Sequence, residues 1–225
     1  MLQPSYLPWL GYFDQMRRAD VFVFYDDVQY DRESWRNRNR IKTREGWQWL
    51  TVPVRLGGRF GSAIVDVEID ERRDWRRKHL MTLAQSYARA PYLKRYLEGI
   101  ERILLARGAR LVDLNVELTR YLSDELGLTT RCLRSSELGV AGARSERLVD
   151  ICRALQATHY LTGDAARSYL DETLFEEAGI RVEYHGYRHP SYSQLHGEFL
   201  PYMSVVDLLF NCGEDSLEVL KGGDP

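Results

Sequence analysis

An apolar run at residues 21–25, followed at once by Asp26 and Asp27, constrains the fold more than any other feature of the sequence. A loop with two prolines and a glycine precedes it at residues 3–11, and residues 10–18 carry apolar side chains at helical spacing. A short strand that is apolar throughout and follows a helix is typical of a parallel sheet with both faces covered. The polar loops of such a sheet lie at its carboxyl edge, so we expect both aspartates there.

A second unit near the C-terminus repeats this order of strand, polar loop, helix and strand. Its strands are expected at residues 158–161 and 180–184, and its polar loop contains Gly163 and Asp171. Because the polar loops of both units leave strands at the carboxyl edge, we expect them to meet in one pocket.

Further strands and a helical region separate the two units. Strand patterns occur at residues 47–54 and 63–69, joined by a link at Gly57-Gly58. Apolar residues then recur at helical spacing over about residues 75–128. The sequence therefore predicts a single α/β domain over residues 1–225, with a mostly parallel, Rossmann-like sheet and an inserted helical region.

The composition limits the class of protein. The three cysteines, Cys132, Cys152 and Cys212, are odd in number and widely spaced, so neither a disulfide framework nor a CxxC metal motif is expected. No apolar run approaches the ~18 residues needed to cross a bilayer, and the first residues do not resemble a signal peptide. We therefore expect a soluble, cytoplasmic protein without a membrane partner.

The formal net charge of -2 hides a difference between the two halves of the chain. Residues 1–110 contain 21 Lys/Arg and 14 Asp/Glu, whereas residues 111–225 contain 10 and 19. A basic half attracts anionic small molecules such as a nucleotide or a sugar phosphate, although ordinary surface charge explains the balance equally well. No run of Lys/Arg exceeds three residues, so nucleic acid is not an expected partner.

Residues 30–43 form a polar, aromatic and basic stretch without a clear period, which is typical of a functional loop. Arginine forks beside Trp35 suit the recognition of phosphate or sugar. We therefore expect Arg38, Arg40 and Lys42 to bind a phosphate-bearing ligand. The alternative is a loop that only borders the domain.

Asp26 is the main candidate for chemistry. A carboxylate at the end of a buried strand can act as a general base or bind Mg²⁺. Adjacent residues of an extended chain point in opposite directions, so one of Asp26 and Asp27 would serve the site. The alternative is that Asp26 pairs with an arginine and holds the loop.

Other catalytic patterns are missing from the sequence. His185, His189 and His196 lie near Glu198, but their spacing fits no zinc motif, and no metal is expected there. Neither a GxSxG motif nor a cysteine in a recognisable nucleophile setting occurs, so covalent catalysis is not indicated.

A series of longer motifs runs in order across nearly the whole chain. They include QPxYLPxxGYF at residues 3–13, DxFVxYDDVQ at 20–29, WxNRNxIK at 35–42 and FLPxxSxxDLLFNxG at 199–213. In this order the motifs resemble those of the WbqC-like protein family. A match to one short block could arise by chance, whereas a match to all of them is specific.

The resemblance implies a role in bacterial surface polysaccharide biosynthesis, including that of O-antigen. Members of the family often lie beside genes of such pathways, and transfer of an aminoacyl group such as glycine to an amino sugar has been proposed for some. It thus implies an acyl or aminoacyl transferase, or an ATP-dependent ligase, that forms an amide on an amino sugar. The cofactor is left open, with ATP and Mg²⁺ as candidates. The alternative is a non-catalytic module that binds a nucleotide sugar or an acyl donor.

A weaker analogy concerns the opening strand, glycine-bearing loop and helix. They are similar to the nucleotide-binding folds of nucleotidyltransferases, so the expected fold class is Rossmann-like or nucleotidyltransferase-like. Those enzymes carry an HxGH motif where residues 8–12 of this chain contain no histidine, so the analogy does not extend to adenylation chemistry.

These interpretations define candidate site residues in the two polar loops and in the motifs. The candidate catalytic residues are Asp26 and Asp171. The candidate substrate-binding residues are Gln3, Tyr6, Tyr25, Gln29, Trp35, Asn37, Arg38, Lys42, Gly163, Tyr169 and Ser204.

Overall fold

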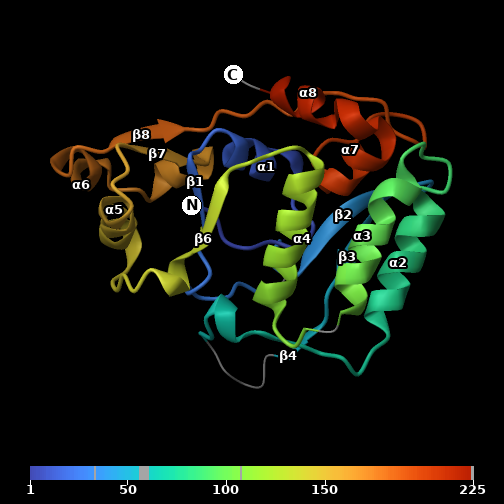
Figure 1. The fold of residues 1–225 in the computed structure, drawn as a ribbon, viewed down its shortest axis with the longest axis horizontal. Helices are drawn as coiled ribbons and strands as arrows, with labels where there is room; N and C mark the ends of the chain where they lie inside the picture. Colours follow the sequence, from blue (N-terminus) through green and yellow to red (C-terminus); the bar gives the residue numbers. More distant parts are fainter. Residues whose placement is uncertain (33, 56–60, 107, 224–225) are drawn as a thin grey trace.

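The structure is a computed structural model that describes residues 1–32, 34–55, 61–106 and 108–223 (Figure 1). Helices and short strands alternate along the chain. The helices are α1 (Leu10–Arg17), α2 (Trp75–Ser86), α3 (Leu93–Leu105), α4 (Leu111–Glu125), α5 (Arg144–Ala154), α6 (Glu172–Glu177), α7 (Val205–Cys212) and α8 (Ser216–Lys221). The strands are β1 (Val21–Phe24), β2 (Arg38–Thr43), β3 (Gly46–Thr51), β4 (Val54–Arg55), β5 (Glu68–Ile69), β6 (Arg131–Arg134), β7 (His159–Thr162) and β8 (Arg181–Tyr184).

The described strands form two parallel and two antiparallel pairs. β1 pairs with β6 and β7 pairs with β8 in parallel, while β2 and β3 form an antiparallel hairpin and β4 and β5 a second antiparallel pair. Leu2 adds one bridge to β1 at Phe24. The mixed α/β composition therefore agrees with the sequence, but these pairs do not show one mostly parallel sheet of the Rossmann-like or nucleotidyltransferase-like type.

Two parts of the region before the helices differ from the sequence pattern. The alternation over residues 63–69 predicts one strand, but a 3₁₀ turn at Ile64–Asp66 precedes the two-residue strand β5. The turn forms because backbone N–H groups of Ile64 and Val65 donate to the carbonyls of Val28 and Asp26, 2.9 and 3.0 Å away, instead of to a strand partner. The predicted link at Gly57-Gly58 lies outside the described residues.

The helical region appears where periodicity places it. Helices α2, α3 and α4 pack side by side (Figure 1), and Pro91 lies between α2 and α3, as expected for a residue that interrupts helical hydrogen bonding. None of the described helices is both long and apolar enough to span a membrane.

The described apolar residues divide into a large and a small cluster. The large cluster joins α1, β1 and β2 to α2–α4 and α7 through fully buried aromatic residues such as Phe13, Tyr87 and Phe210. The small cluster joins α5, α6, β7 and β8, and in it Tyr160 and Phe175 stack with ring centroids 5.0 Å apart. Figure 1 shows the small cluster's elements at the opposite end of the molecule from α2 and α3, with α1 and β1 between.

A buried histidine links the N-terminal loop to α2. The ring of His79 is 6% exposed, its Nδ1 accepts a hydrogen bond from the hydroxyl of Tyr6 at 2.9 Å, and it also bonds the backbone of Thr51. Burial lowers the pKa of His79 from 6.5 to about 4, against the opposing effect of the Thr51 bond. Protonation would both charge a buried ring and remove the acceptor that Tyr6 needs.

We expect acid to destabilise the fold through His79. Its pKa is lower in the folded chain, so between pH 6.5 and about 4 the unfolded state binds more protons and stability falls as pH falls. The full difference is worth roughly 3 kcal/mol. His79→Gln keeps a donor and an acceptor without titrating, so urea unfolding should show a flatter pH dependence than in the wild type. Equal slopes for both proteins would contradict this origin.

Candidate functional site

A cavity of about 1180 Å³ lies between the N-terminal half of the chain and the small cluster. Its lining includes Gln3 from the first loop, Tyr25 from the end of β1, Trp35 and Arg36 from the loop before β2, and Gly163 from the loop after β7. This volume is slightly above the usual range for small-molecule sites, which is roughly 300–1,000 Å³. The loops that follow β1 and β7 therefore do contribute to a common cavity.

The candidate residues from the sequence fall into two groups. Those that line the cavity are Gln3, Tyr25, Trp35, Gly163, Tyr169 and Asp171. Those that do not are Tyr6, Asp26, Gln29, Asn37, Arg38, Lys42 and Ser204.

Most of the second group make structural contacts. Asn37 donates to the Val52 carbonyl at 2.9 Å, Arg38 stacks on Trp49 at 4.5 Å, and Ser204 accepts from the Val206 N–H at the start of α7. The buried Lys42 ammonium donates to the carbonyls of residues 197 and 198, and burial lowers its pKa. These side chains do not line the cavity, and their contact with a ligand stays a prediction.

Asp26 is fully buried behind the cavity wall. Its Oδ1 accepts from the Ser136 N–H and its Oδ2 from the Ser136 hydroxyl, both at 3.0 Å, while the Ser135 hydroxyl, which donates to Asp27, lies 3.2 Å from Oδ1. Arg134 lies 3.6 Å from Oδ2. These contacts tie the end of β1 to the turn after β6.

The neighbouring carboxylate is engaged as well. Asp27 forms an ion pair with Arg147 and accepts from the Ser135 hydroxyl at 2.5 Å. Burial acts to raise the pKa of Asp27, but the bonds from Arg147 and Ser135 outweigh it and lower that pKa. Because all four oxygens of Asp26 and Asp27 already accept hydrogen bonds, the pair does not fit a Mg²⁺ site. Nor do the described residues contain a group of three or more His, Cys, Asp or Glu arranged to hold a metal ion.

Two arginines of the cavity wall have incomplete hydrogen bonding. Arg36 donates to the Ser5 hydroxyl at 2.9 Å and Arg40 to the Tyr202 carbonyl at 3.3 Å, but the Nε of each is buried and has no partner among the described residues. Neither has a carboxylate within ion-pair distance in the described part of the chain. Burial lowers the pKa of both guanidinium groups. An anion in the cavity would compensate both charges.

Aromatic rings surround Arg40. Its guanidinium lies 5.3 Å from the centre of the Trp35 ring, 5.4 Å from that of Trp47 and 5.9 Å from that of Trp49. Trp35 and Trp47 remain 41% and 49% exposed. This arrangement leaves faces on which a sugar or a base could stack.

The opposite wall comes from the small cluster and carries acidic groups. Glu146 at the start of α5, Asp164 after β7 and Asp171 before α6 all line the cavity. Asp171 caps α6 by accepting from the Thr173 N–H at 3.2 Å, and its own N–H donates to the Ser145 hydroxyl at 3.0 Å. The cavity thus has a basic and a largely acidic side.

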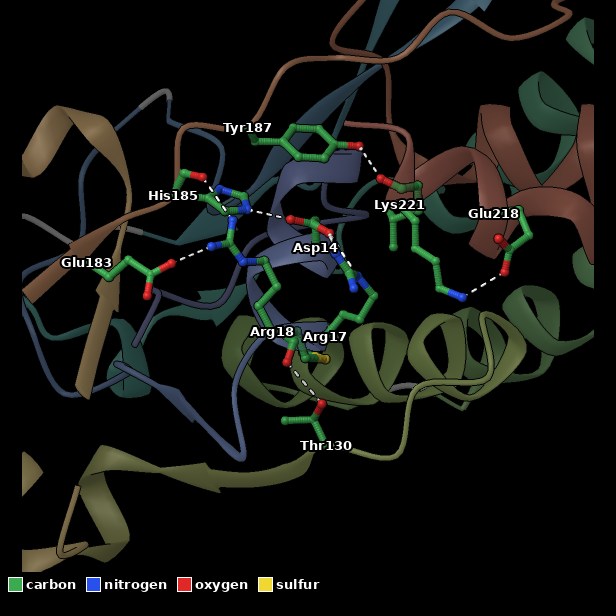
Figure 2. Close-up of polar contacts among 11 residues, drawn as sticks. Asp14, Arg17, Arg18, Thr130, Glu183, His185, Tyr187, Glu218 and Lys221 are labelled. Atoms are coloured by element: carbon green, nitrogen blue, oxygen red, sulfur yellow. Dashed lines mark hydrogen bonds and ion pairs between the residues drawn. The ribbon is translucent and has the colours of Figure 1, made fainter. Parts of the chain in front are cut away.

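An acid–histidine pair closes the cavity next to α1 (Figure 2). The Nε2–H of His185 donates to Oδ2 of Asp14 at 2.7 Å, and Arg17 donates twice to Oδ1 of Asp14, at 2.7 and 2.9 Å. Burial acts to raise the pKa of Asp14, but the bonds from His185 and Arg17 outweigh it and keep that pKa low. Figure 2 also shows Arg18, which bonds Glu183 and the His185 carbonyl.

Sequence reasoning missed this pair because nothing local marks it. Asp14 lies within a helix and His185 follows a strand 171 positions later. Arg36 was also missed, although it belongs to the same basic loop as Arg38, and the recurrence of arginine at every second position from Arg36 to Arg40 was the available signal.

The chain folds into a mixed α/β structure with a cavity lined by polar and aromatic side chains. The chain belongs to the WbqC-like protein family, whose model matches residues 3–219. It is 41% identical over 225 residues to the uncharacterized protein Rv1507c of Mycobacterium tuberculosis, an alignment that covers 98% of this chain and 96% of that protein. No solved structure matches the chain significantly.

The two candidate carboxylates should respond differently to substitution. Asp26→Asn removes a charge that two donors of Ser136 and the nearby Arg134 stabilise, so the free energy of unfolding should fall by about 1–3 kcal/mol. Asp171→Asn keeps a favourable helix cap and should change stability little. Urea unfolding of the two variants and the wild type would measure this difference. An Asp26→Asn protein as stable as the wild type would contradict the structural role of Asp26.

Proposed function

We propose that this protein binds a phosphate-bearing amino sugar, such as a nucleotide sugar, in the cavity. It transfers an acyl or aminoacyl group such as glycine to the sugar's amine and so forms an amide for surface polysaccharide biosynthesis. The family supports the setting in sugar biosynthesis. A cytoplasmic location is part of the proposal, because nucleotide sugars are made in the cytoplasm.

The observation that carries the proposal is the pair of arginines on the basic wall. Arg36 and Arg40 lie partly buried in the cavity wall, have no carboxylate within ion-pair distance among the described residues and keep a buried Nε–H without an acceptor. A phosphate oxygen is the natural acceptor for such groups, because guanidinium forks match phosphate geometry. A buried N–H without an acceptor is costly, and an anionic ligand in the cavity would supply the missing acceptor.

Other lining residues suit the sugar. The Oε1 of Gln3 is buried without a partner in the described structure and could accept from a hydroxyl. Trp35, Tyr25 and the 71% exposed Tyr169 offer ring faces. Asp171 would attract the amine from the acidic wall, and we keep it as a candidate contact. A catalytic role of Asp26 was expected from the sequence, but its hydrogen bonds with Ser136 favour a structural role that connects the end of β1 to the turn after β6.

A non-catalytic binding module is the second candidate function. The specific observation in its favour is that Asp26, the main candidate for chemistry, does not line the cavity and has its carboxylate engaged. Both candidates predict ligand binding. They differ in whether an amide product forms, so the wild-type protein should be incubated with UDP-glucosamine, glycine or an activated acyl donor, and ATP, and the mixture analysed by mass spectrometry. The amide product supports the transferase, and binding without product supports the module.

The arginines should control affinity. Arg36→Met and Arg40→Met keep the aliphatic stem and remove the charge, so each should weaken binding of UDP-glucosamine by about 1.5–3 kcal/mol, or roughly 10- to 150-fold in Kd. Isothermal titration calorimetry measures this change. Arg95→Met is the matched control, because Arg95 pairs with Glu214 at the surface and does not line the cavity.

Inorganic phosphate, UDP and UDP-glucose should be titrated alongside. Loss of affinity for all phosphate-bearing compounds would place the phosphate on these arginines. Equal affinity of wild type and both variants, or no binding of any compound by the folded wild type, would contradict the anion site.

A further inference from the structure

The Asp14–His185 pair is not explained by the anion site. The Asp14 carboxylate is fully buried and does not line the cavity, whereas His185 is 4% exposed and does. His185 therefore lies between the carboxylate and the cavity. Its ring is held in place by stacking on Tyr187, with centroids 5.3 Å apart and planes 9° from parallel, and the backbone N–H of His185 donates to the Thr162 carbonyl at 2.8 Å.

The hydrogen bond to Asp14 selects one form of the imidazole. Arg17 keeps Asp14 ionised, so the carboxylate is an acceptor and Nε2 of His185 must carry a hydrogen. In the neutral ring this leaves the lone pair on Nδ1. That nitrogen has no hydrogen-bond partner among the described residues, and the ring lies at the cavity wall. The ring is thus oriented and has one basic nitrogen unused.

We infer that His185 is the proton acceptor of the cavity, oriented by Asp14, for the amine that the ligand presents. The inference rests on the proposed function and deepens it. His185 is the catalytic residue in this assignment, and Asp14 is a positioning residue because it acts through His185. Carboxylate-oriented histidines serve this purpose in unrelated folds.

The acyl transfer that we infer uses an activated acyl donor, either a thioester or an acyl phosphate. The sugar's amine attacks the acyl carbon and a C–N bond forms, while a proton of the amine passes to Nδ1 of His185. The imidazolium is stabilised by Asp14. The bond between the acyl carbon and the leaving sulfur or oxygen then breaks with its electron pair, and the leaving group takes the proton from His185.

Several charged groups surround the ring. Arg17 and Arg18 face it from α1, Glu183 from β8 neutralises Arg18, and Asp164 accepts from the Gly186 N–H at 3.1 Å beside it. The ring also stacks on Tyr187. Of these groups Asp14 alone bonds the imidazole itself in the described structure, so its removal should disturb the orientation of the ring most.

A purely structural role makes a different prediction. The pair could only tie the end of β8 to α1, as the nearby Arg18–Glu183 ion pair does. Glu183→Gln is therefore the matched control: it weakens the same connection between α1 and β8, and Glu183 does not line the cavity. His185→Gln and Asp14→Asn are the test variants.

The test measures amide formation from UDP-glucosamine and an acetyl or glycyl thioester from about pH 5.5 to about pH 8.5, with calorimetric Kd for the same nucleotide. His185→Gln should lower kcat by about 100-fold or more while Kd changes by less than about threefold. Asp14→Asn should lower kcat by roughly 10- to 100-fold while Kd changes by less than about threefold. Glu183→Gln should stay within about threefold of the wild type.

A second measurement keeps the test independent of turnover and of folding defects. In the ¹⁵N spectrum of histidine-labelled wild type, UDP-glucosamine should raise the protonated fraction of Nδ1 of His185, whereas UDP-glucose, which lacks the amine, should not. Unchanged resonances, or wild-type kcat in His185→Gln, would overturn the assignment even if amide forms. The expected resonance change without any amide product would reject the transferase while supporting His185 as the acceptor of the amine's proton.

Discussion

The cavity depends on the polar contacts that join α1 to β7 and β8. Gln15 donates to the Leu161 carbonyl at 3.0 Å, Arg18 to the His185 carbonyl at 3.0 Å, and His185 to Asp14. These contacts connect the two apolar clusters at the edge of α1. Because a hydrogen bond fixes the distance and direction between its groups, they leave the space beside them open. If apolar side chains replaced these polar contacts, the two clusters would pack against each other and the cavity would be smaller.

The buried polar groups of this chain show how a structural residue differs from a candidate ligand contact. Asp26 and Lys42 look functional in the sequence, but their charged atoms are engaged by protein groups. Arg36 and Arg40 keep a buried donor that nothing in the described structure satisfies. Since an unsatisfied buried group costs free energy, the second pair carries more information about function than the first.

The charge difference between the two halves of the chain reappears across the cavity. The basic half supplies Arg36 and Arg40, while the acidic half supplies Glu146, Asp164 and Asp171, with Arg144 as the exception on that side. Such a site would suit a ligand that carries phosphate at one end and an amine at the other. His185 lines the same cavity as these acidic residues, so an amine attracted to them could reach the His185 ring.

The sequence by itself determined much of the local structure and the family. Apolar spacing located α1 and the three helices α2–α4, the apolar run located β1, and the ordered motifs identified the WbqC-like family. It also predicted that the loops after β1 and β7 share a cavity, although that prediction assumed one parallel sheet and the two strands belong to separate pairs.

Only the tertiary structure decided which polar side chains face the cavity. A polar residue in a motif, such as Asn37 or Ser204, can be conspicuous because it bonds the backbone, and no local pattern separates this from ligand contact. The same holds for secondary structure at residues 63–69. Their alternation predicts a strand, but the backbone N–H groups of Ile64 and Val65 donate to carbonyls more than 30 positions away and a turn forms instead. His185 and Asp14 meet across 171 positions, and such a long-range contact is set by packing and not by spacing along the chain.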